Sequence, residues 1–473
     1  MDDLLIVGAG PTGLMLGCWL AASGVKVRIV DPKPGPTPET RAVGVQARTL
    51  EFWAILGIVD RALTRGRKGL AADFWVQGRR VARAEFGAMG SGLSPYPYFF
   101  LLGQDQTEQM LYERLKELGG EVEWGVAVTE IQGNTATLGE ERANFRFILG
   151  CDGARSIVRK TAGLEFPGGT YDSRFYVADI DASGGVVPGE LNIALFRDRF
   201  LAFFPLKEEH RYRMVGLLDP ALDPETATID DVRPELERLM KTQIETVRWF
   251  SVYRVHHRVV ERFRNGHLFL LGDAAHVHSP VGGQGMNTGL GDATNLAWKL
   301  VEVLKHGADE RLLETYDAER RPFAESLVQT TDRAFELIVR QTPLARFVRI
   351  RILPYVLPIA FRIGAIRRLA FRTVSQIRIS YRKGPLAKGP RGGDRLPPLE
   401  QPAKPGRWQL VTVGAEKPEG MDWCSARDID PEVRPGPPEI LLVRPDGYVG
   451  VSLPKFSAEA LDDYLRRVIG RPI

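Results

Sequence analysis

The sequence predicts an α/β protein: a parallel sheet covered by helices, an antiparallel sheet inserted into it, and a small α+β unit at the end. A buried strand, a glycine-rich turn and a helix open the chain. Short strand-like segments dominate two later stretches, and a hairpin with a helix ends the chain. At about 150 residues per domain, 473 residues are enough for two or three domains.

Residues 4–31 read as strand, turn, helix and strand, which is a βαβ unit. The apolar run "LLIV" is continuous, as expected of a strand in a parallel sheet that is buried on both faces. The turn "GAGPTG" leaves three positions without a Cβ atom, so that a pyrophosphate can approach the backbone and the helix can close on the strand. The residues of this turn predicted to bind the ligand are Gly8, Gly10, Pro11, Thr12 and Gly13.

Asp31 ends the second strand of this unit, 18 positions after Gly13. An acid near this spacing accepts hydrogen bonds from a ribose, and it disfavours a 2′-phosphate. The unit is therefore predicted to be Rossmann-like and to bind a dinucleotide, with NAD and FAD both open at this point.

The stretch "GDAAHVHSPVGGQGMNTGLGDATNLAWKL", residues 272–300, is a second glycine cluster after an apolar strand. Asp273 would accept hydrogen bonds from ribityl hydroxyls, and a second helix N-terminus would stabilise the charge of a reduced flavin ring by about 0.3–2 kcal/mol. These features favour FAD. The residues predicted to contact it here are Pro280, Gly283, Gly285, Met286 and Asn287, and Asp152 in "CDGARSIVR" follows a third apolar strand.

Composition narrows the class of protein further. Apolar residues make up 44% and charged residues 26%, as in a globular protein, and a net charge of +4 gives no argument for nucleic acid. Three cysteines without a CxxC pair fit a reducing compartment. The N-terminus lacks the basic region of a signal peptide and no long apolar run occurs, so we expect a cytoplasmic protein without a transmembrane segment.

These motifs, together with "RAVGVQARTLEFWAILGI", resemble those of the single-component FAD-dependent aromatic hydroxylases, the group A flavoprotein monooxygenases with a p-hydroxybenzoate hydroxylase-like fold. The resemblance covers about residues 1–340, and the C-terminal segment resembles the thioredoxin-like domain of the phenol and polyketide hydroxylase branch. It implies a Rossmann-like FAD-binding domain at 1–72, 101–170 and 261–340, a substrate-binding antiparallel β domain at 73–100 and 171–260, a helical connector at 341–384 and a thioredoxin-like α+β domain at 385–473.

By the same resemblance, Arg41 would contact the pyrophosphate region, Gln104 the ribityl chain, and Val128 the adenine through its backbone. The family usually has Glu at the position of Asp31, and the shorter side chain of Asp reduces the reach to the ribose. The implied reaction is reduction of the flavin by NADH or NADPH, capture of O2 as a C4a-hydroperoxyflavin, and transfer of one oxygen to a phenolic or polyketide-like ring.

No catalytic base can be named from the sequence. Tyr176, His210, Tyr212 and Arg213 lie in the predicted substrate domain, but each is typical of an ordinary sheet. His276 and His278 lack a third ligand at metal-binding spacing, so no metal is assigned and both are interpreted as packing or hydrogen bonding near the flavin.

Two alternatives stay open. The same fold could serve a flavin-dependent reductase or a halogenase, although no tryptophan here forms the halogenase motif WxWxIP. The arginine-rich stretch 343–383 has no Asp or Glu and could contact anionic lipid or a partner. We favour short helices, broken at Pro354 and Pro358, that pack domains together with their arginines extended to water.

Overall fold

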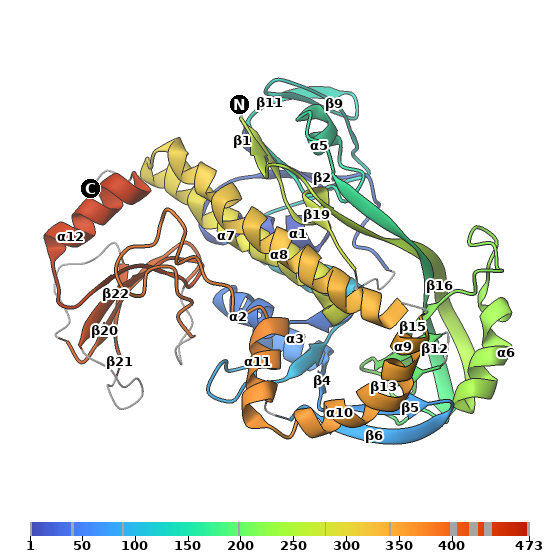
Figure 1. Ribbon diagram of the computed structural model, residues 1–473. Helices are drawn as coiled ribbons and strands as arrows, with labels where there is room; N and C mark the ends of the chain where they lie inside the picture. The colour runs from blue at the N-terminus through green and yellow to red at the C-terminus, as the bar shows by residue number, and fades with distance from the viewer. Residues whose placement is uncertain are drawn as a thin grey trace.

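The structure is a computed structural model that describes residues 2–38, 42–87, 89–196, 199–279, 281–339, 342–397, 404–415, 424–429 and 438–470. In this part of the chain, the strands form four sheets with helices packed around them (Figure 1). No helix in these ranges is long and apolar enough to cross a membrane.

The first sheet contains the N-terminal βαβ unit. Its central strands run parallel, and residues 4–7, 29–31 and 147–150 in three of them are buried. The order is β17 (Arg264–Asn265), β18 (Leu268–Leu270), β11 (Glu141–Gly150), β1 (Asp2–Val7), β2 (Arg28–Asp31) and β8 (Glu123–Trp124), and β9 (Val128–Gln132) and β10 (Thr135–Leu138) extend β11.

Helix α1 packs against both α4 and α7, and α7 runs beside α8 through the middle of the molecule (Figure 1). The apolar residues of α7, among them Leu290, Ala293 and Leu300, are buried. The helices of this part are α1 (Pro11–Ala22), α2 (Ala47–Ile55), α3 (Val59–Arg65), α4 (Gln104–Glu117), α5 (Ile157–Thr161), α7 (Gly285–His306) and α8 (Glu314–Val339), with short turns η1 (Gly272–Ala274), η2 (Val281–Gly283) and η3 (Glu310–Leu313).

The second sheet is almost wholly antiparallel, with one parallel pair between β13 and β5. Its order is β19 (His276–Val277), β16 (Thr242–Val259), β12 (Gly168–Gly184), β15 (Arg211–Leu217), β14 (Phe200–Pro205), β13 (Leu191–Leu195), β5 (Ala71–Val76) and β6 (Arg79–Glu85), and α6 (Ile229–Met240) covers β16.

This sheet differs from the predicted segments at two places. Strand β5 begins at Ala71 rather than at position 73, and β7 (Phe99–Leu101) leaves this sheet to pair with β3 (Gly44–Val45) and β4 (Arg67–Gly69). In addition, β19 directly follows the second glycine cluster's first turn and pairs with β16. The two large sheets are therefore joined next to Asp273.

The C-terminal sheet has the order β21 (Cys424–Ile429), β20 (Trp408–Val413), β22 (Glu439–Val443) and β23 (Val449–Leu453), followed by α12 (Ala458–Asp463) and η5 (Tyr464–Ile469). The hairpin predicted around "PDG" joins β22 to β23. The stretch after Pro385 is no simple linker, because Lys388 and Arg395 form β-bridges with Val451 and Tyr448. Trp408 and Tyr464 belong to the same apolar core as Leu4 and Trp298.

The predicted connector forms α9 (Pro343–Phe347), η4 (Val348–Ile352), α10 (Leu353–Ala360) and α11 (Gly364–Val374). Helix α10 rests on β6 at the edge of the antiparallel sheet (Figure 1). The expectation that its apolar residues pack domains together is only partly correct, since many of them face solvent.

Candidate active site

Four predicted site residues follow the carboxyl ends of four adjacent parallel strands. Gly8 follows β1, Asp31 ends β2, Asp152 follows β11 and Asp273 follows β18. Because the carboxyl ends of parallel strands share one edge of the sheet, the three glycine-containing segments meet along one line. This edge is where a doubly wound sheet holds its ligand.

The first glycine turn is closed at two positions and open at one. A Cβ atom on Gly13 would lie 1.9 Å from the Gly8 carbonyl oxygen, and one on Gly8, at φ +100°, would lie 2.5 Å from the Cys151 oxygen. By contrast, a Cβ atom on Gly10 would meet nothing within 4 Å. Gly10 is also the N-cap of α1, with Pro11 in the first turn. Gly8 and Gly13 are therefore packed against the protein, whereas the backbone at Gly10 and the first amides of α1 remain accessible at the edge of the sheet where the ligand is expected.

Asp31 holds the shape of this turn. Its Oδ2 accepts a hydrogen bond from the Ala9 N–H at 2.7 Å, and its Oδ1 accepts one from the Lys33 N–H at 2.8 Å. A carboxylate oxygen has a second lone pair, so these bonds leave acceptor capacity for a ribose hydroxyl. Asp has a shorter side chain than the Glu usual in the family, and here its carboxylate binds the backbone N–H groups of Ala9 and Lys33.

Gln104 and Val128 each begin a secondary-structure element. Gln104 begins α4, and its Oε1 accepts from the Ala42 N–H at 3.2 Å while its Nε2 donates to Glu108 at 2.9 Å. Val128 begins β9, two residues after Val126, whose N–H donates to the Asp31 carbonyl at 3.2 Å. Arg41 lies outside the described residues.

Asp152 accepts hydrogen bonds from the first amides of helix α5, whose N-cap residue is Ser156. Its Oδ2 accepts from the Ile157 N–H at 2.7 Å and from the Val158 N–H at 3.3 Å. Burial raises the pKa of its carboxyl, and the hydrogen bonds from Ser156 and from the helix amides oppose that rise. The contacts that Asp152 makes within the protein are therefore structural ones, at the start of α5.

The second glycine cluster lies directly against the first. Thr12 Oγ1 would be 2.7 Å from a Cβ atom on Gly272 and 2.3 Å from one on Gly289, so α1 and α7 approach each other through bare backbone. Asp273 is exposed although Gly272 and Ala274 on either side are buried. This places an acidic side chain at the surface of the ligand edge.

The loop before α7 is shaped by glycines with positive φ, 77° at Gly282 and 62° at Gly283. A Cβ atom on Gly283 would lie 3.5 Å from the Gly44 Cα atom, and one on Gly285 would lie 3.8 Å from His278 Nε2. Met286 is half-buried and packs against the main core. Pro280 lies outside the described residues.

Asn287 ties this loop to the segment that opens α2. Its Oδ1 accepts from the Gln46 N–H at 2.8 Å and from Thr49 Oγ1 at 2.7 Å, while its Nδ2 donates to the Gly44 and Gly283 carbonyls. The side chain is buried and all of its hydrogen-bonding capacity is used. The side chain is accordingly committed to contacts within the protein, and only the backbone amide of Asn287, in the first turn of α7, is left for the predicted ligand contact.

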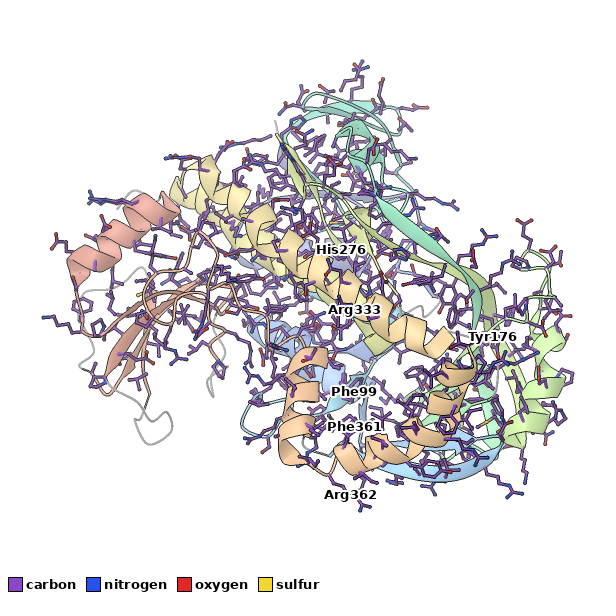
Figure 2. The ribbon with its side chains drawn as sticks, viewed as in Figure 1. Phe99, Tyr176, His276, Arg333, Phe361 and Arg362 are labelled. Atoms are coloured by element: carbon purple, nitrogen blue, oxygen red, sulfur yellow. The ribbon has the colours of Figure 1, made fainter. Side chains whose placement is uncertain are left out.

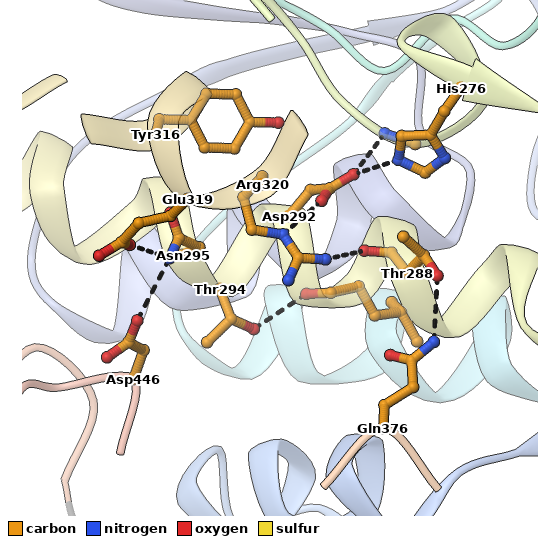
Figure 3. A network of polar contacts seen from close by, with 12 residues as sticks. His276, Thr288, Asp292, Thr294, Asn295, Tyr316, Glu319, Arg320, Gln376 and Asp446 are labelled. Atoms are coloured by element: carbon orange, nitrogen blue, oxygen red, sulfur yellow. Dashed lines mark hydrogen bonds and ion pairs between the residues drawn. The ribbon is translucent and has the colours of Figure 1, made fainter. Parts of the chain in front are cut away.

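A buried charge cluster that was not predicted lies behind the second glycine cluster's first turn (Figure 3). Asp292 accepts from the Gly272 N–H at 3.1 Å, lies 2.7 Å from His276 Nε2, and accepts from Arg320 Nε at 2.7 Å. Burial alone would raise the pKa of Asp292, but the charges of Arg320 and His276 lower it. A carboxylate between Leu290 and Ala293, on the buried side of the predicted helix, was the available signal.

His278 is placed beside the first turn of α7. Its Nδ1 bonds the Ser279 carbonyl at 2.8 Å, so Nδ1 carries the proton and Nε2 is an acceptor. Burial lowers the pKa of His278 to about 4. A neutral imidazole with a buried acceptor therefore lies near the predicted flavin edge.

Of the four residues named from the predicted substrate domain, three are ordinary sheet residues and one lies in a turn. Tyr176 is buried and stacks on Phe250, and Arg213 forms a buried two-point ion pair with Asp179 at 2.7 Å. Tyr212 packs on Phe203, and His210 is exposed in a turn. Figure 2 shows Tyr176 on this sheet and Phe99 near the middle of the molecule.

The fold and this edge define a class of protein, one that binds a flavin dinucleotide. The open position at Gly10 fits a pyrophosphate, and the glycine loop before α7 fits a flat ring that lies on backbone amides. A family model described as FAD binding domain matches residues 1–331. The chain belongs to the FAD-dependent flavoprotein monooxygenases that act on aromatic compounds, and it is an FAD-binding enzyme.

Relatives of known name match this chain over nearly its whole length. A flavin-dependent monooxygenase of Mycobacteroides abscessus is 32% identical, with 98% of this chain and 100% of the relative covered. The 12-dehydrotetracycline 5-monooxygenase/anhydrotetracycline 6-monooxygenase of Streptomyces rimosus is 31% identical, with 99% of each chain covered. The structure of the anhydrotetracycline hydroxylase OxyS from Streptomyces rimosus superposes with a TM-score of 0.79 at 30% identity, covering 100% of this chain and 99% of that one.

Proposed function

We propose that this enzyme hydroxylates a phenolic or polyketide-like aromatic compound, consuming NADH or NADPH and O2. The observation that carries the proposal is the meeting of two glycine-lined helix N-termini, those of α1 and α7, at one edge of the parallel sheet. The antiparallel sheet joins this edge through β19, next to Asp273. Relatives named as monooxygenases of tetracycline intermediates and of para-nitrophenol support the substrate class.

Different residues of the site would bind different parts of FAD. The amides at the N-terminus of α1 would bind the pyrophosphate at Gly10, with Arg41 beside it, and Asp31 would accept from the ribose. The remaining assignments are Gln104 to the ribityl chain, Val128 to the adenine, and Asp152 and Asp273 to cofactor hydroxyls.

When bound, FAD supplies the redox chemistry, namely hydride acceptance from the nicotinamide and activation of O2 for transfer of one oxygen atom. The protein supplies charge placement. The amides of Gly285, Met286 and Asn287 at the N-terminus of α7 would stabilise negative charge on the reduced flavin, and the Asn287 side chain fixes the start of α7 by donating to the Gly44 and Gly283 carbonyls. His278 Nε2 offers an uncharged acceptor beside them.

The domain assignments follow the same proposal. We assign 1–72, 101–170 and 261–340 to FAD binding, 73–100 and 171–260 to the substrate, and 385–473 to a thioredoxin-like domain. The strand order β21-β20-β22-β23, with one parallel and two antiparallel pairs, supports the last assignment. Cys18, Cys151 and Cys424 form no disulfide bond, which supports placing the enzyme in the reducing cytoplasm.

The test is to purify the protein, record its flavin spectrum, and screen phenols and tetracyclic polyketides for accelerated NADH or NADPH oxidation. The expected result is a product heavier by one oxygen atom, with label incorporated from ¹⁸O2. A reductase would oxidise the nicotinamide without adding oxygen to the substrate, and a halogenase would require halide. Either result, or a protein that cannot be loaded with FAD, would refute the proposal.

A further inference from the structure

The exposed apolar residues of this molecule gather on one segment. Twelve large apolar side chains are exposed in the described part of the chain, and all except Leu70 and Phe456 lie between Leu344 and Leu369. We call this surface the connector face. Its most exposed members, each more than half exposed, are Leu344, Phe347, Val356, Ile359, Ile363 and Leu369. Concentration of this kind marks an interaction site, because single exposed apolar residues are normally scattered.

The same face is cationic. Arg351, Arg362, Arg368 and Arg372 are exposed, and none of them forms an ion pair with a described residue. The sequence has no Asp or Glu between Glu336 and Asp394, so the segment itself supplies no negative charge. The partner that fits is one that offers both apolar surface and negative charge.

The inner side of the segment is anchored to the body of the protein. Phe361 packs edge-on against Phe86 at 5.8 Å between ring centroids, and Phe371 and Pro354 are buried. Figure 2 shows Phe361 toward the body and Arg362 at the outer edge. The connector is therefore a two-sided element, with one side packed and the other presented to solvent.

We propose that the connector face docks on the surface of a membrane that contains anionic phospholipids. Arginines interleaved with aliphatic and aromatic side chains are suited to the boundary between headgroups and acyl chains, where phosphates meet the guanidinium groups. A second copy of this chain fits poorly, because a two-fold contact would bring one cationic face against another. The inference goes beyond the proposed function and does not depend on it.

The test is co-sedimentation of the FAD-loaded, full-length enzyme with vesicles of two parts phosphatidylcholine to one part phosphatidylglycerol, and with phosphatidylcholine alone. The enzyme is expected to bind the first and to leave them at high salt. The variant R362E/R368E should lose about 25-fold or more of its partitioning, because the loss of each arginine alone costs roughly fivefold. The variant I359S/I363S should lose binding to a similar extent while keeping its flavin spectrum.

A matched control is K455E/R466E, which changes the net charge equally on exposed residues of the C-terminal unit. It should bind vesicles as the unchanged enzyme does. Failure of the enzyme to bind anionic vesicles, or equal loss in the control, would overturn the proposal. So would a dimer in light scattering that R362E/R368E dissociates, or binding of polyglutamate without binding of vesicles.

Discussion

At the scale of single residues, Asp292 fixes the backbone at the ligand edge of the parallel sheet. A buried carboxylate is costly unless it is paired, and this one has Arg320, His276 and the Gly272 amide as partners. Since Gly272 directly precedes Asp273, the cluster fixes the backbone from which the predicted ribityl contact projects. The same cluster connects α7 with α8 through Arg320 (Figure 3).

The open position at Gly10 gives the sharpest residue-level prediction. Gly10→Ala places a methyl group where nothing lies within 4 Å, on a backbone that alanine tolerates at φ −75°. We expect FAD affinity to fall about tenfold or more, with stability of the apoprotein reduced by about 1 kcal/mol through the N-cap. Flavin titration and thermal unfolding measure the two effects.

Gly364→Ala is the control, because a Cβ atom there also meets nothing within 4 Å. It should bind FAD as before. Equal FAD affinity in Gly10→Ala and Gly364→Ala would show that no pyrophosphate lies on the first turn.

His278 predicts a pH dependence of stability. Burial lowers its pKa from 6.5 to about 4, so between these values the unfolded chain binds more protons than the folded one. The stability associated with the neutral imidazole is complete above pH 6.5 and is lost as the pH falls toward 4, by up to about 3 kcal/mol. Urea unfolding at saturating FAD, at pH 5 and pH 7, measures the loss. His278→Gln should flatten this part of the profile, and an unchanged slope in that variant would contradict the assignment.

At the scale of elements, an ion network joins the β22–β23 hairpin to α7 and α8. Arg444 donates to Glu319 at 2.5 Å and to Asp446, and Lys299 donates to Glu319 at 3.0 Å. Burial alone would raise the pKa of Glu319, but the charges of Arg444 and Lys299 lower it to about 2. Its contribution to stability is therefore present above about pH 4.5 and is lost as the pH falls toward 2.

Arg444→Met should weaken this joint strongly. It leaves Glu319 and Asp446 with one fewer cation inside the protein, and breaking a buried pair costs about 3–5 kcal/mol. Guanidinium unfolding of the FAD-loaded protein measures the change. Arg467→Met, which removes the exposed ion pair between Arg467 in η5 and Asp463 at the end of α12, should leave stability nearly unchanged. Similar losses in the two variants would mean that the buried network does not hold the joint.

At the scale of the whole molecule, the parallel sheet and the C-terminal sheet share one core. Trp298 of α7 and Trp408 of β20 are buried and meet edge to face at 5.6 Å, and Trp408 Nε1 donates to Glu302 at 2.9 Å. The C-terminal sheet therefore covers apolar surface of the long helices.

This shared core predicts that the two sheets unfold together. Calorimetry of the FAD-loaded enzyme should show both sheets unfolding in one transition. Trp408→Ala should reduce the free energy of unfolding by about 3–5 kcal/mol and so lower the midpoint temperature of that transition. Trp124→Ala, at a half-buried position against Tyr112, should have a smaller effect. A separate early transition for the C-terminal sheet of the unchanged enzyme would refute the common core.

Much of the fold follows from local pattern. The continuous apolar runs and their glycine turns predicted β1, α1, β18 and α7 near their observed bounds, since burial on both faces and tight turns impose residue types on neighbouring positions. The same patterns placed Gly8, Asp31, Asp152 and Asp273 at strand ends. The family of the enzyme could be inferred from these motifs because their spacing reflects one ligand.

The partners of these residues were decided by tertiary structure. Asn287 meets Gln46 across 241 positions, and Arg444 meets Glu319 across 125. No local pattern encodes such contacts, because they depend on how whole elements pack. The exposed face of the connector was also not predictable, since its apolar residues read alike whether they pack on a domain or face solvent. The sequence by itself determined the elements and the ligand edge, whereas only the packing of distant elements decided which charges are buried together and which apolar residues stay outside.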